Sequence, residues 1–369
     1  MCKKKSVLWI IVFAVLIIIP PVLYPIIGKY VDTENYENRS TAEKPKLAIN
    51  TLKNYPEEYE DYYNDTLPFR NYLIRLNSYI DYYVFNQSSS EKVALGEEGW
   101  LFYRGTSTDT SPIKDSLGYF SFTEEQLETI ADNLIATAEV LEDKDIEFIL
   151  FIAPNKETIY KEYLPGYYSV QNDVTRADQL VKYLQENTDI RVIYPKTELL
   201  EQKEAYPDIL LYDKLDTHWN YAGSYIGTKN LAAELGIEMP DLNVLQLDEV
   251  ISSTGDLTNM LNMEIKNGNI DYDISGEGIY FREDVEMEDI NEFISENESA
   301  DERKIFISRD SFSTAMAPFL SELFAESKFV KRSAFEESQI YEFGADIFVY
   351  EVVERSIGGL VGFKLSGEG

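Results

Sequence analysis

The chain contains a single histidine, and the residues around it have the clearest potential for chemistry. His218 lies in the segment YDKLDTHWNYAG, residues 212–223, two positions after Asp216. Imidazole is the side chain whose unperturbed pKa lies nearest neutral pH, so His218 is the natural acid–base group of this protein. In extended or loop backbone, residues i and i+2 project to the same side. The Asp216 carboxylate can therefore hold one ring nitrogen while the other nitrogen faces a substrate.

A nucleophile for such a base occurs later in the chain, in the segment KIFISRDSFSTAMAPFLSELF. Residues 304–308 predict a strand, Arg309 and Asp310 a turn, and the residues from Phe312 onward an amphipathic helix. Ser311 therefore lies at a strand-to-helix turn, where its hydroxyl is presented at the carboxyl end of the strand. The first N–H groups of the helix have no intrahelical partner and could bind an oxyanion.

These residues also have ordinary structural explanations. Ser311 is well suited to cap the following helix, the commonest task of a serine at that position. A histidine beside an aspartate is often a structural hydrogen-bonded pair, and the tripeptide RDS alone carries little information. The catalytic interpretation is favoured by the conjunction of one histidine, a neighbouring aspartate and a serine at a strand–turn–helix junction.

The motifs around these residues resemble those of a known family. DTHWN, RDSFS and GEEGWLFY are similar to motifs of the SGNH-hydrolase-like proteins of the alginate O-acetylation type (AlgX/AlgJ-like), and especially of their Gram-positive relatives, the DHHW proteins. Further segments follow in the order of that family and extend the resemblance over nearly everything after the N-terminal apolar run: ENR at 37–39, residues 64–70, APNKETIY at 153–160, GDL at 255–257 and VYEVVER at 349–355.

The resemblance implies a catalytic triad of Asp216, His218 and Ser311. In that family the Asp and His come from a D-x-H motif and the Ser from a later D-S-F motif, an order reversed from that of ordinary SGNH esterases. Two positions differ from the family pattern. Thr217 replaces the second residue of D-H-H-W, and Arg309 stands where a glycine is common before D-S.

Other residues are candidates for substrate binding or oxyanion stabilisation. Asn155 and Lys156 follow a predicted strand at its carboxyl end, where ligands bind in open α/β sheets, although a turn and a helix start explain them equally well. The amide of Phe312 is a candidate oxyanion donor, and Arg309 is a candidate at the same turn.

Arg355 is the last of these candidates, and the resemblance implies that it lies near the site together with Glu354. A structural ion pair between the two side chains explains them equally well.

The sequence after residue 120 alternates between helical and strand patterns, which predicts a mostly parallel sheet with helices on both faces. With the resemblance, this gives an SGNH-hydrolase-like (flavodoxin-like) α/β fold with a circularly permuted motif order. The predicted helices are 123–142, which opens with a capping box at Thr123 and Gln126, and 175–186, 196–203 and 220–235; the predicted strands are 147–153, 191–194, 209–212, 304–308, 328–332 and 346–353.

The flanking regions have different patterns. Residues 30–53 are polar and predict a linker, and residues 56–85 predict two helices broken at Leu67-Pro68, with Leu73, Leu76, Ile80 and Tyr83 as a core stripe. Residues 93–103 predict a hairpin. Residues 236–300 predict a β-rich insertion. We expect three parts: residues 1–29 as a cytoplasmic tip and membrane anchor, 30–90 as linker and helical segment, and 91–369 as the SGNH-like domain.

The N-terminus predicts a membrane anchor. Three lysines, at positions 3 to 5, precede an apolar run over residues 7–28, about the 20 residues that a bilayer span needs. The lysines favour a cytoplasmic N-terminus and an extracytoplasmic catalytic body. No A-x-A-like site follows, which disfavours a cleaved signal peptide. Pro20, Pro21 and Pro25 predict a kink or an end of the helix near its outer side.

Composition excludes several other classes of function. The formal net charge is −33, and since three of the 33 Lys and Arg residues precede the apolar run, the rest of the chain carries 30 basic and 66 acidic residues, or −36. Nucleic acid is therefore not an expected partner. With one histidine, one cysteine, no H-E-x-x-H, no Walker A loop and no G-x-G-x-x-G, neither a metal nor another cofactor is expected.

The function that we predict is O-acyl transfer, with acetyl as the expected group, to a cell-envelope polysaccharide or exopolysaccharide through an acyl-serine. The resemblance also implies a membrane-bound acyltransferase partner that supplies the acyl group. Two alternatives stay open: a carbohydrate esterase or deacetylase with the same triad, and a non-catalytic scaffold of a polysaccharide modification or export complex.

Overall fold

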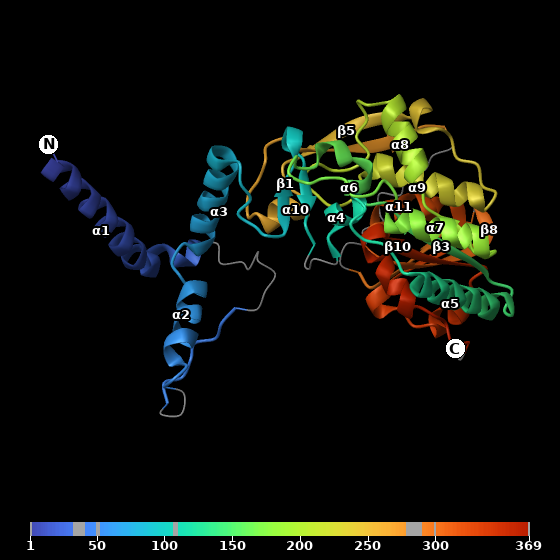
Figure 1. The fold of residues 1–369 in the computed structure, drawn as a ribbon, viewed down its shortest axis with the longest axis horizontal. Coiled ribbons are helices and arrows are strands. Elements are labelled where there is room, and N and C mark those ends of the chain that lie inside the picture. Colours follow the sequence, from blue (N-terminus) through green and yellow to red (C-terminus); the bar gives the residue numbers. More distant parts are fainter. Residues whose placement is uncertain are drawn as a thin grey trace. The chain divides into compact units, whose positions relative to one another are not determined.

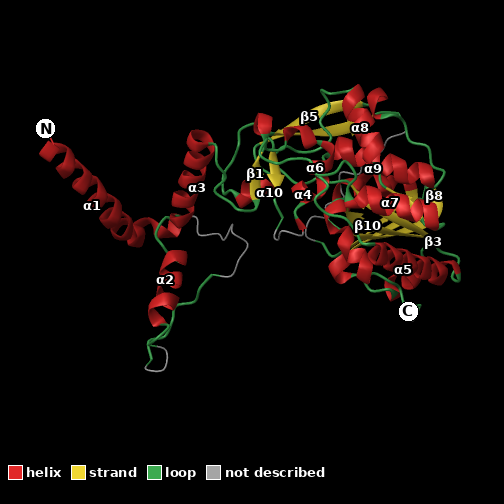
Figure 2. Cartoon of the chain, in the orientation of Figure 1, coloured by secondary structure: helices red, strands yellow, loops and turns green. Residues whose placement is uncertain are grey.

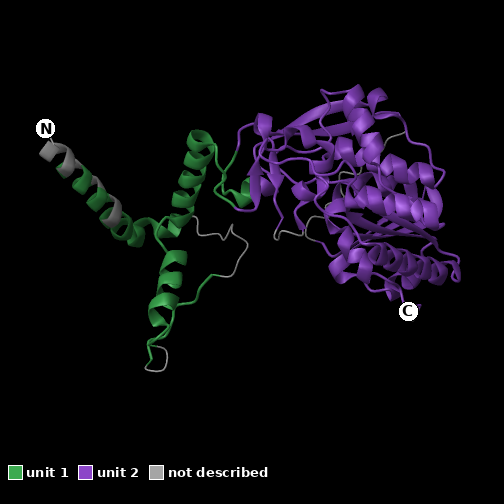
Figure 3. Ribbon diagram, viewed as in Figure 1, with its two compact units in different colours: residues 1–90, 258–264 green, residues 91–257, 265–369 purple. Residues whose placement is uncertain are grey.

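A computed structural model describes residues 2–31, 41–48, 52–105, 110–277, 290–298 and 300–367. The chain divides into two compact units, of which the first comprises residues 1–90 and 258–264 and the second comprises residues 91–257 and 265–369 (Figure 3). The motif at 37–39 and residues 278–289 of the predicted insertion lie outside the described residues.

The second unit is built on a six-stranded sheet in the order β4-β3-β10-β8-β9-β7 (Figures 1 and 2). All neighbouring strands pair in parallel except β7, which is antiparallel to β9. The predicted mostly parallel sheet is therefore confirmed. Its strands are β3 (Glu147–Ala153), β4 (Arg191–Ile193), β7 (Glu292–Glu296), β8 (Asp301–Arg309), β9 (Phe324–Lys331) and β10 (Ile347–Val353).

Alternate residues of the strands enter two separate cores, which explains why β3 is apolar after its first residue, the exposed Glu147. Ile149 and Phe151 pack on one face with helices α9 and α11, whereas Phe148 and Leu150 pack on the other with α5 and α7. Both faces are thus covered by helices, as the continuous apolar pattern predicts. The helices of this unit are α4 (Pro112–Ser116), α5 (Glu124–Glu142), α6 (Lys156–Ile159), α7 (Arg176–Asn187), α8 (Lys196–Ala205), α9 (Tyr221–Glu234), α11 (Ser313–Leu323), α12 (Ser338–Phe343) and the 3-10 segment η8 (Glu354–Gly362), while α10 (Asp256–Met260) runs from this unit into the first.

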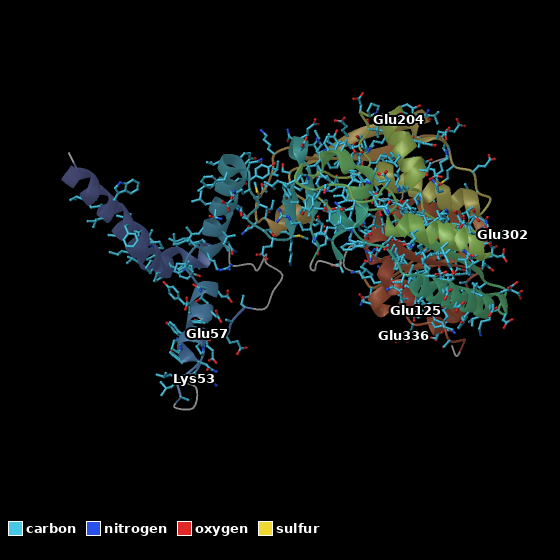
Figure 4. All side chains as sticks on the ribbon, in the orientation of Figure 1. Lys53, Glu57, Glu125, Glu204, Glu302 and Glu336 are labelled. Atoms are coloured by element: carbon cyan, nitrogen blue, oxygen red, sulfur yellow. The ribbon has the colours of Figure 1, made fainter. Side chains whose placement is uncertain are left out.

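Local signals fix the helix starts. Thr123 and Gln126 form the predicted capping box at the start of α5, and Asn220 accepts a hydrogen bond from the Gly223 N–H at the start of α9. Two hairpins, β1 (Val93–Leu95) with β2 (Leu101–Tyr103) and β5 (Gln246–Ser252) with β6 (Asn269–Ser275), confirm the expected β structure at 93–103 and within the insertion. Acidic side chains are exposed over this unit, among them Glu125, Glu204, Glu302 and Glu336 (Figure 4).

The predicted strand at 209–212 is wrong. Only Tyr212 makes a β-bridge, to Trp219. Leu210 and Leu211 donate their backbone N–H groups to the hydroxyls of Tyr272 and Tyr160 instead of to a neighbouring strand. The apolar run is buried as a loop, because side chains satisfy its backbone where a sheet partner would otherwise be needed.

The first unit contains α1 (Cys2–Ile27), α2 (Tyr55–Asp65) and α3 (Arg70–Ile80), and the break expected at Leu67-Pro68 is present. The predicted core stripe on α3 is wrong: Leu73 and Leu76 are 48% and 56% exposed, and Ile80 and Tyr83 are exposed as well. Helical periodicity marks an apolar face, but it does not supply the element that would cover that face.

Among the described residues, one helical stretch, Trp9–Tyr30, is long and apolar enough to cross a membrane, with a mean hydropathy of 2.8. A signal sequence near an N-terminus has the same length and composition. Pro20, Pro21 and Pro25 lie inside α1, so they do not end the helix, which continues to Ile27.

Candidate active site

The structure brings Asp216, His218 and Ser311 into one hydrogen-bonded row. The Nδ1 atom of His218 lies 2.6 Å from Oδ1 of Asp216, and Nε2 lies 2.7 Å from Oγ of Ser311. Since the carboxylate accepts from Nδ1, Nε2 is left to accept the proton of the serine hydroxyl. Asp216 and His218 come from the loop before α9, and Ser311 follows β8 at the carboxyl edge of the sheet, as the sequence predicts.

The loop that carries the base is fixed at both of its ends. Tyr212 and Trp219 form the isolated β-bridge, and Asn220 caps α9. The indole N–H of Trp219 donates to the carbonyl oxygen of Phe312 at 2.9 Å, which ties the loop to the turn that holds the nucleophile. The rings of His218 and Phe312 lie 5.0 Å apart.

Asp216 accepts hydrogen bonds on both carboxylate oxygens. Oδ1 accepts from the ring and from the backbone N–H of His218, and Oδ2 accepts from the backbone N–H of Asp256 at 2.7 Å. Burial alone would raise the pKa of Asp216, yet the hydrogen bond and charge of His218 hold that pKa well below its usual range. Burial likewise acts to lower the pKa of His218, but Asp216 outweighs it and the pKa is raised.

Asp256 is a site residue that the motif analysis did not single out, although the segment GDL contains it. Its carboxylate accepts from the backbone N–H of Thr217 at 2.8 Å and from the Thr217 hydroxyl at 2.5 Å. Burial and the negative charge of Asp216 raise its pKa. Gly255 explains the rest of the segment, since a Cβ atom there would lie 2.5 Å from the carbonyl oxygen of Leu215.

Lys156 supports the loop and does not face a substrate, which corrects the prediction. Its side chain is fully buried, and its ammonium group donates to the backbone carbonyls of Asp213 at 3.1 Å, Lys214 at 3.3 Å and Asp216. The rings of Trp100 and Phe102 lie beside it. The sequence suggests a ligand at this sheet edge, whereas the structure uses the cation to hold the backbone around Asp216.

The turn around Ser311 is organised by Asp310 and Glu351. One Asp310 oxygen accepts from the Phe312 N–H at 2.9 Å, while the backbone N–H of Asp310 and the hydroxyl of Ser313 donate to Glu351 on β10. Burial and the charge of Asp310 raise the pKa of Glu351 well above its ordinary value. The Phe312 amide is therefore already engaged and is not free to bind an oxyanion, which corrects that expectation.

Ser311 does not cap the helix with its side chain. Phe312 is the residue before α11, and the hydroxyl of Ser311 contacts His218 instead. Arg309 is also not directed to the row of candidate residues: it is buried and donates to the carbonyls of Asp310 and Ile290 and to the Thr314 hydroxyl. Arg309, which stands where a glycine is common, thus stabilises the turn before α11 and the first turn of that helix.

Asn155, Glu354 and Arg355 meet at the carboxyl ends of β3 and β10. Glu354 accepts from the backbone N–H of Asn155 and from the Thr158 hydroxyl, and Asn155 Oδ1 accepts from the Arg355 N–H at 3.3 Å. Among the described residues the Asn155 side-chain nitrogen is buried without a partner. The Arg355 guanidinium stacks over Phe312, 5.2 Å from the ring centre, so Arg355 lies beside the site and not in an ion pair with Glu354.

Of the described residues, Asp216, His218 and Asp256 form the one group whose potential ligand atoms lie within 4.8 Å of one another. These atoms are engaged in the hydrogen bonds already described, between Asp216 and His218 and between Asp256 and Thr217. The arrangement is that of an oriented base, and no feature of it assigns an ion.

Comparison with known families identifies the kind of domain that holds Asp216 and His218. Residues 93–274 match the family model described as an SGNH hydrolase-like domain, acetyltransferase AlgX. The chain carries an SGNH hydrolase-like domain. This confirms the resemblance that the motifs indicate. The matched part includes Asp216, His218 and Asp256 but ends before Ser311, so the assignment of Ser311 depends on its contact with His218.

Several solved structures are similar to this chain, and PatB1 shares its fold. PatB1 from Bacillus cereus is 16% identical with a TM-score of 0.54, over 74% of this chain and 99% of PatB1. A DHHW family protein from Eubacterium siraeum is 14% identical with a TM-score of 0.46, over 74% of this chain and 99% of that protein. The O-acetyltransferase domain of Pseudomonas putida AlgJ is also 14% identical, with a TM-score of 0.45, over 74% of this chain and 93% of that domain. No curated protein matches this chain at a significant level.

Proposed function

We propose that this protein is an SGNH-type O-acyltransferase that transfers an acyl group, expected to be acetyl, to a polysaccharide of the cell envelope or an exopolysaccharide. One observation carries the proposal: the unbroken row from Asp216 through His218 to Ser311, with distances of 2.6 and 2.7 Å. These are the contacts that an activated serine needs. The description of the matched family as an acetyltransferase supports acetyl as the group.

In the first half of the reaction, Oγ of Ser311 attacks the carbonyl carbon of the donor ester while Nε2 of His218 takes its proton. Asp216 holds the Nδ1–H tautomer and stabilises the imidazolium that forms. The tetrahedral intermediate collapses, the donor alcohol leaves with the proton from His218, and an acyl-serine remains. In the second half, His218 deprotonates a sugar hydroxyl, whose oxygen attacks the acyl carbon. The bond between that carbon and Oγ of Ser311 then breaks, and His218 returns the proton to Oγ.

Two groups are proposed to stabilise the oxyanion. The backbone N–H of Ser311 has no acceptor among the described residues, and the buried side-chain nitrogen of Asn155 has no partner there either. Asn155 is joined to the site because its side-chain oxygen Oδ1 accepts from the backbone N–H of Arg355, whose guanidinium stacks on Phe312. Removal of one such donor typically lowers kcat about 10²–10³-fold.

The proposal extends to location and partners. In this proposal helix α1 is a single membrane anchor with a cytoplasmic N-terminus, and the apolar stretch of this helix supports the assignment. Residues 30–90 form a linker and a helical segment, and residues 91–369 form the extracytoplasmic domain. The resemblance supports a polysaccharide acceptor and a membrane-bound acyltransferase that supplies the acyl group.

The test uses the full chain in detergent with a chromogenic acetyl ester, followed by mass spectrometry. We expect an acetyl group on Ser311 that is lost in Ser311→Ala and His218→Ala. Ser321→Ala is the matched control, because this buried serine of α11 has no hydrogen-bond partner among the described residues. A sulfonyl fluoride should label the same serine, a suitable probe because a structure of PatB1 contains a sulfonyl adduct.

The outcomes separate the candidate functions. Faster release of the acetyl group on adding glycans, with acetylated glycan as product, supports transfer, whereas release to water alone supports the esterase. Folded protein that gives no adduct with either reagent would refute the triad and favour the scaffold.

A further inference from the structure

A cavity of about 460 Å³ adjoins the candidate active site. Arg355 forms one of its walls, and the guanidinium of this residue stacks 5.2 Å from the ring centre of Phe312, the residue after Ser311. The volume lies in the range of small-molecule sites. Tyr103, Arg176, Ser356, Gly358 and Gly359 also line the cavity.

Arg355 offers an open hydrogen-bonding face to this cavity. Its guanidinium makes no hydrogen bond and no ion pair with any described residue, although acids outnumber bases two to one in the chain, at 66 to 33. The backbone N–H of Arg355 is held by Asn155, and its side chain is positioned by Phe312. A planar guanidinium held in this way presents several donors in a fixed fork, which fits a carboxylate or a phosphate.

The neighbouring groups are donors as well. Arg176 uses Nε and Nη2 on Asp115, while its Nη1 lies on the cavity side, where a Cβ atom at Gly358 would be 3.8 Å from it. The hydroxyls of Tyr103 and Ser356 have no partner among the described residues. Burial raises the pKa of Tyr103, so its phenol stays protonated and able to donate.

We propose that this cavity binds an anionic group, a carboxylate or a phosphate, on the glycan that accepts the acyl group, and that Arg355 determines this specificity. The inference rests on the proposed acyl transfer and names its acceptor class. The surface as a whole is strongly acidic and repels polyanions, so the selectivity has to come from local contacts of this kind.

The first experiment measures the charge preference of the full-length protein in detergent. Three trisaccharides that differ only at C6 serve as acceptors: one neutral, one carboxylated and one phosphorylated. We expect a KM at least tenfold lower for a charged acceptor than for the neutral one, the size of one charge-assisted contact. The better of the two charged acceptors identifies the anion. Equal KM values for all three would overturn the proposal without any variant.

The second experiment assigns the preference to Arg355. Arg355→Gln should reduce at least tenfold the ratio of the KM for the neutral acceptor to the KM for the charged acceptor. Arg355→Lys should retain a larger part of this ratio for the phosphorylated acceptor than for the carboxylated one, because an ammonium lacks the planar fork of donors. Lys182→Gln, which removes an exposed positive charge on α7, should leave the ratio unchanged. A ratio preserved in both Arg355 variants would refute the role of this residue.

Binding separates this inference from the proposed function. Titration calorimetry of Ser311→Ala with the same trisaccharides needs no turnover, and a tenfold weaker Kd for the charged trisaccharide in Ser311→Ala/Arg355→Gln than in Ser311→Ala supports the cavity. Detection of acetyl-Ser311 tests the chemistry on its own. Acetylation without anion preference refutes only the acceptor class, and anion binding without acetylation refutes only the transfer.

Discussion

Replacement of Asp216 by asparagine separates the orientation of His218 from its charge environment. The carboxylate now accepts from His218 on one oxygen and from the Asp256 N–H on the other. An amide cannot do both. If its NH2 group faces His218, it donates to Nδ1, so the ring proton moves to Nε2 and faces Ser311, which loses its base. If the amide oxygen faces His218 instead, the NH2 group faces the backbone N–H of Asp256. Both groups are donors, so the Asp256 N–H loses its acceptor.

The expected effect is a loss of acylation rate of about 10³–10⁴-fold, since the wrong tautomer removes general-base catalysis. The pH profile should move as well. His218 acts in its neutral form, so the rate rises as the pH increases through its pKa. Burial acts to lower the pKa of His218, but the hydrogen bond and the charge of Asp216 have a larger, opposite effect. The net result is a pKa above the ordinary value of a histidine. Asp216→Asn should therefore shift the rising limb to lower pH while the plateau falls.

Asp256→Asn is the matched control for this variant. The negative charge of Asp256 also raises the pKa of His218, but among the described residues its carboxylate bonds to Thr217 alone. An asparagine there can accept from the Thr217 N–H and donate to the Thr217 hydroxyl. We expect the same direction of pH shift with a loss of less than about tenfold.

The assay is the burst of chromophore released as the acyl-enzyme forms, followed over the pH range. Equal losses in the two variants, or an unmoved pH limb in Asp216→Asn, would refute the assigned role of Asp216.

Three further changes test the surroundings of the site. Lys156→Met removes the ammonium donor from three part-buried backbone carbonyls and leaves those of Asp213 and Asp216 without a donor among the described residues, so the free energy of unfolding, measured in urea, should fall by about 2–4 kcal/mol and acylation should slow at least tenfold. Gly255→Ala places a Cβ atom 2.5 Å from the Leu215 carbonyl oxygen and 2.9 Å from the Asp216 Cβ; it should cost about 1–3 kcal/mol in the same measurement and slow acylation. Burial, and then the charge of Asp115, raise the pKa of Glu354 to about 7, well above the ordinary value of a glutamate. The stabilisation from protonated Glu354 is complete below its unfolded pKa and is lost as the pH rises through about 7, so Glu354→Gln should reduce the fall in unfolding free energy between pH 5 and 8 by about 2–3 kcal/mol. An unchanged stability in either of the first two variants, or an unchanged pH slope in the third, would contradict the respective contact.

The elements that the sequence predicts well are those specified by local chemistry. The start of α5 is fixed by the side chains of Thr123 and Gln126, which bond to backbone within the same turn. Strand β3 is apolar at nearly every position because its two faces enter two cores, and that pattern is visible without knowing its neighbours.

The predictions are wrong where the structure of a segment depends on residues that are distant in the sequence. Residues 209–212 have a strand-like composition, but tyrosine hydroxyls from elsewhere in the chain satisfy their backbone. Leu73 and Leu76 have helical spacing, and no pattern within α3 reveals whether another element covers them. In both examples the sequence has the local preference, but contacts with distant residues determine whether the segment pairs with a strand or buries its apolar face.

The candidate site shows the same division. Asp216, His218 and Ser311 could be predicted because each side chain has a type suited to the chemistry and because one histidine leaves no competing choice. The sequence predicts ligand contacts for Lys156, which follows a strand at its carboxyl end, and for the amide of Phe312, which is among the first N–H groups of a helix. The structure assigns the ammonium and the amide to internal acceptors instead, and hydrogen-bond partners of this kind cannot be read from spacing.

The base and the nucleophile are held by different contacts. Ser311 follows β8, whose backbone is fixed by parallel strands on both sides, and its turn is held by Glu351, which accepts from the Asp310 N–H. The segment from Asp213 to His218 lies in no strand of the sheet. The carbonyls of Asp213 and Asp216 accept from Lys156, and the N–H groups of Thr217 and His218 donate to the carboxylates of Asp256 and Asp216. A buried charge that loses its partner is costly. Substitution of Lys156 should therefore slow the reaction through the backbone of Asp216, which in turn orients His218.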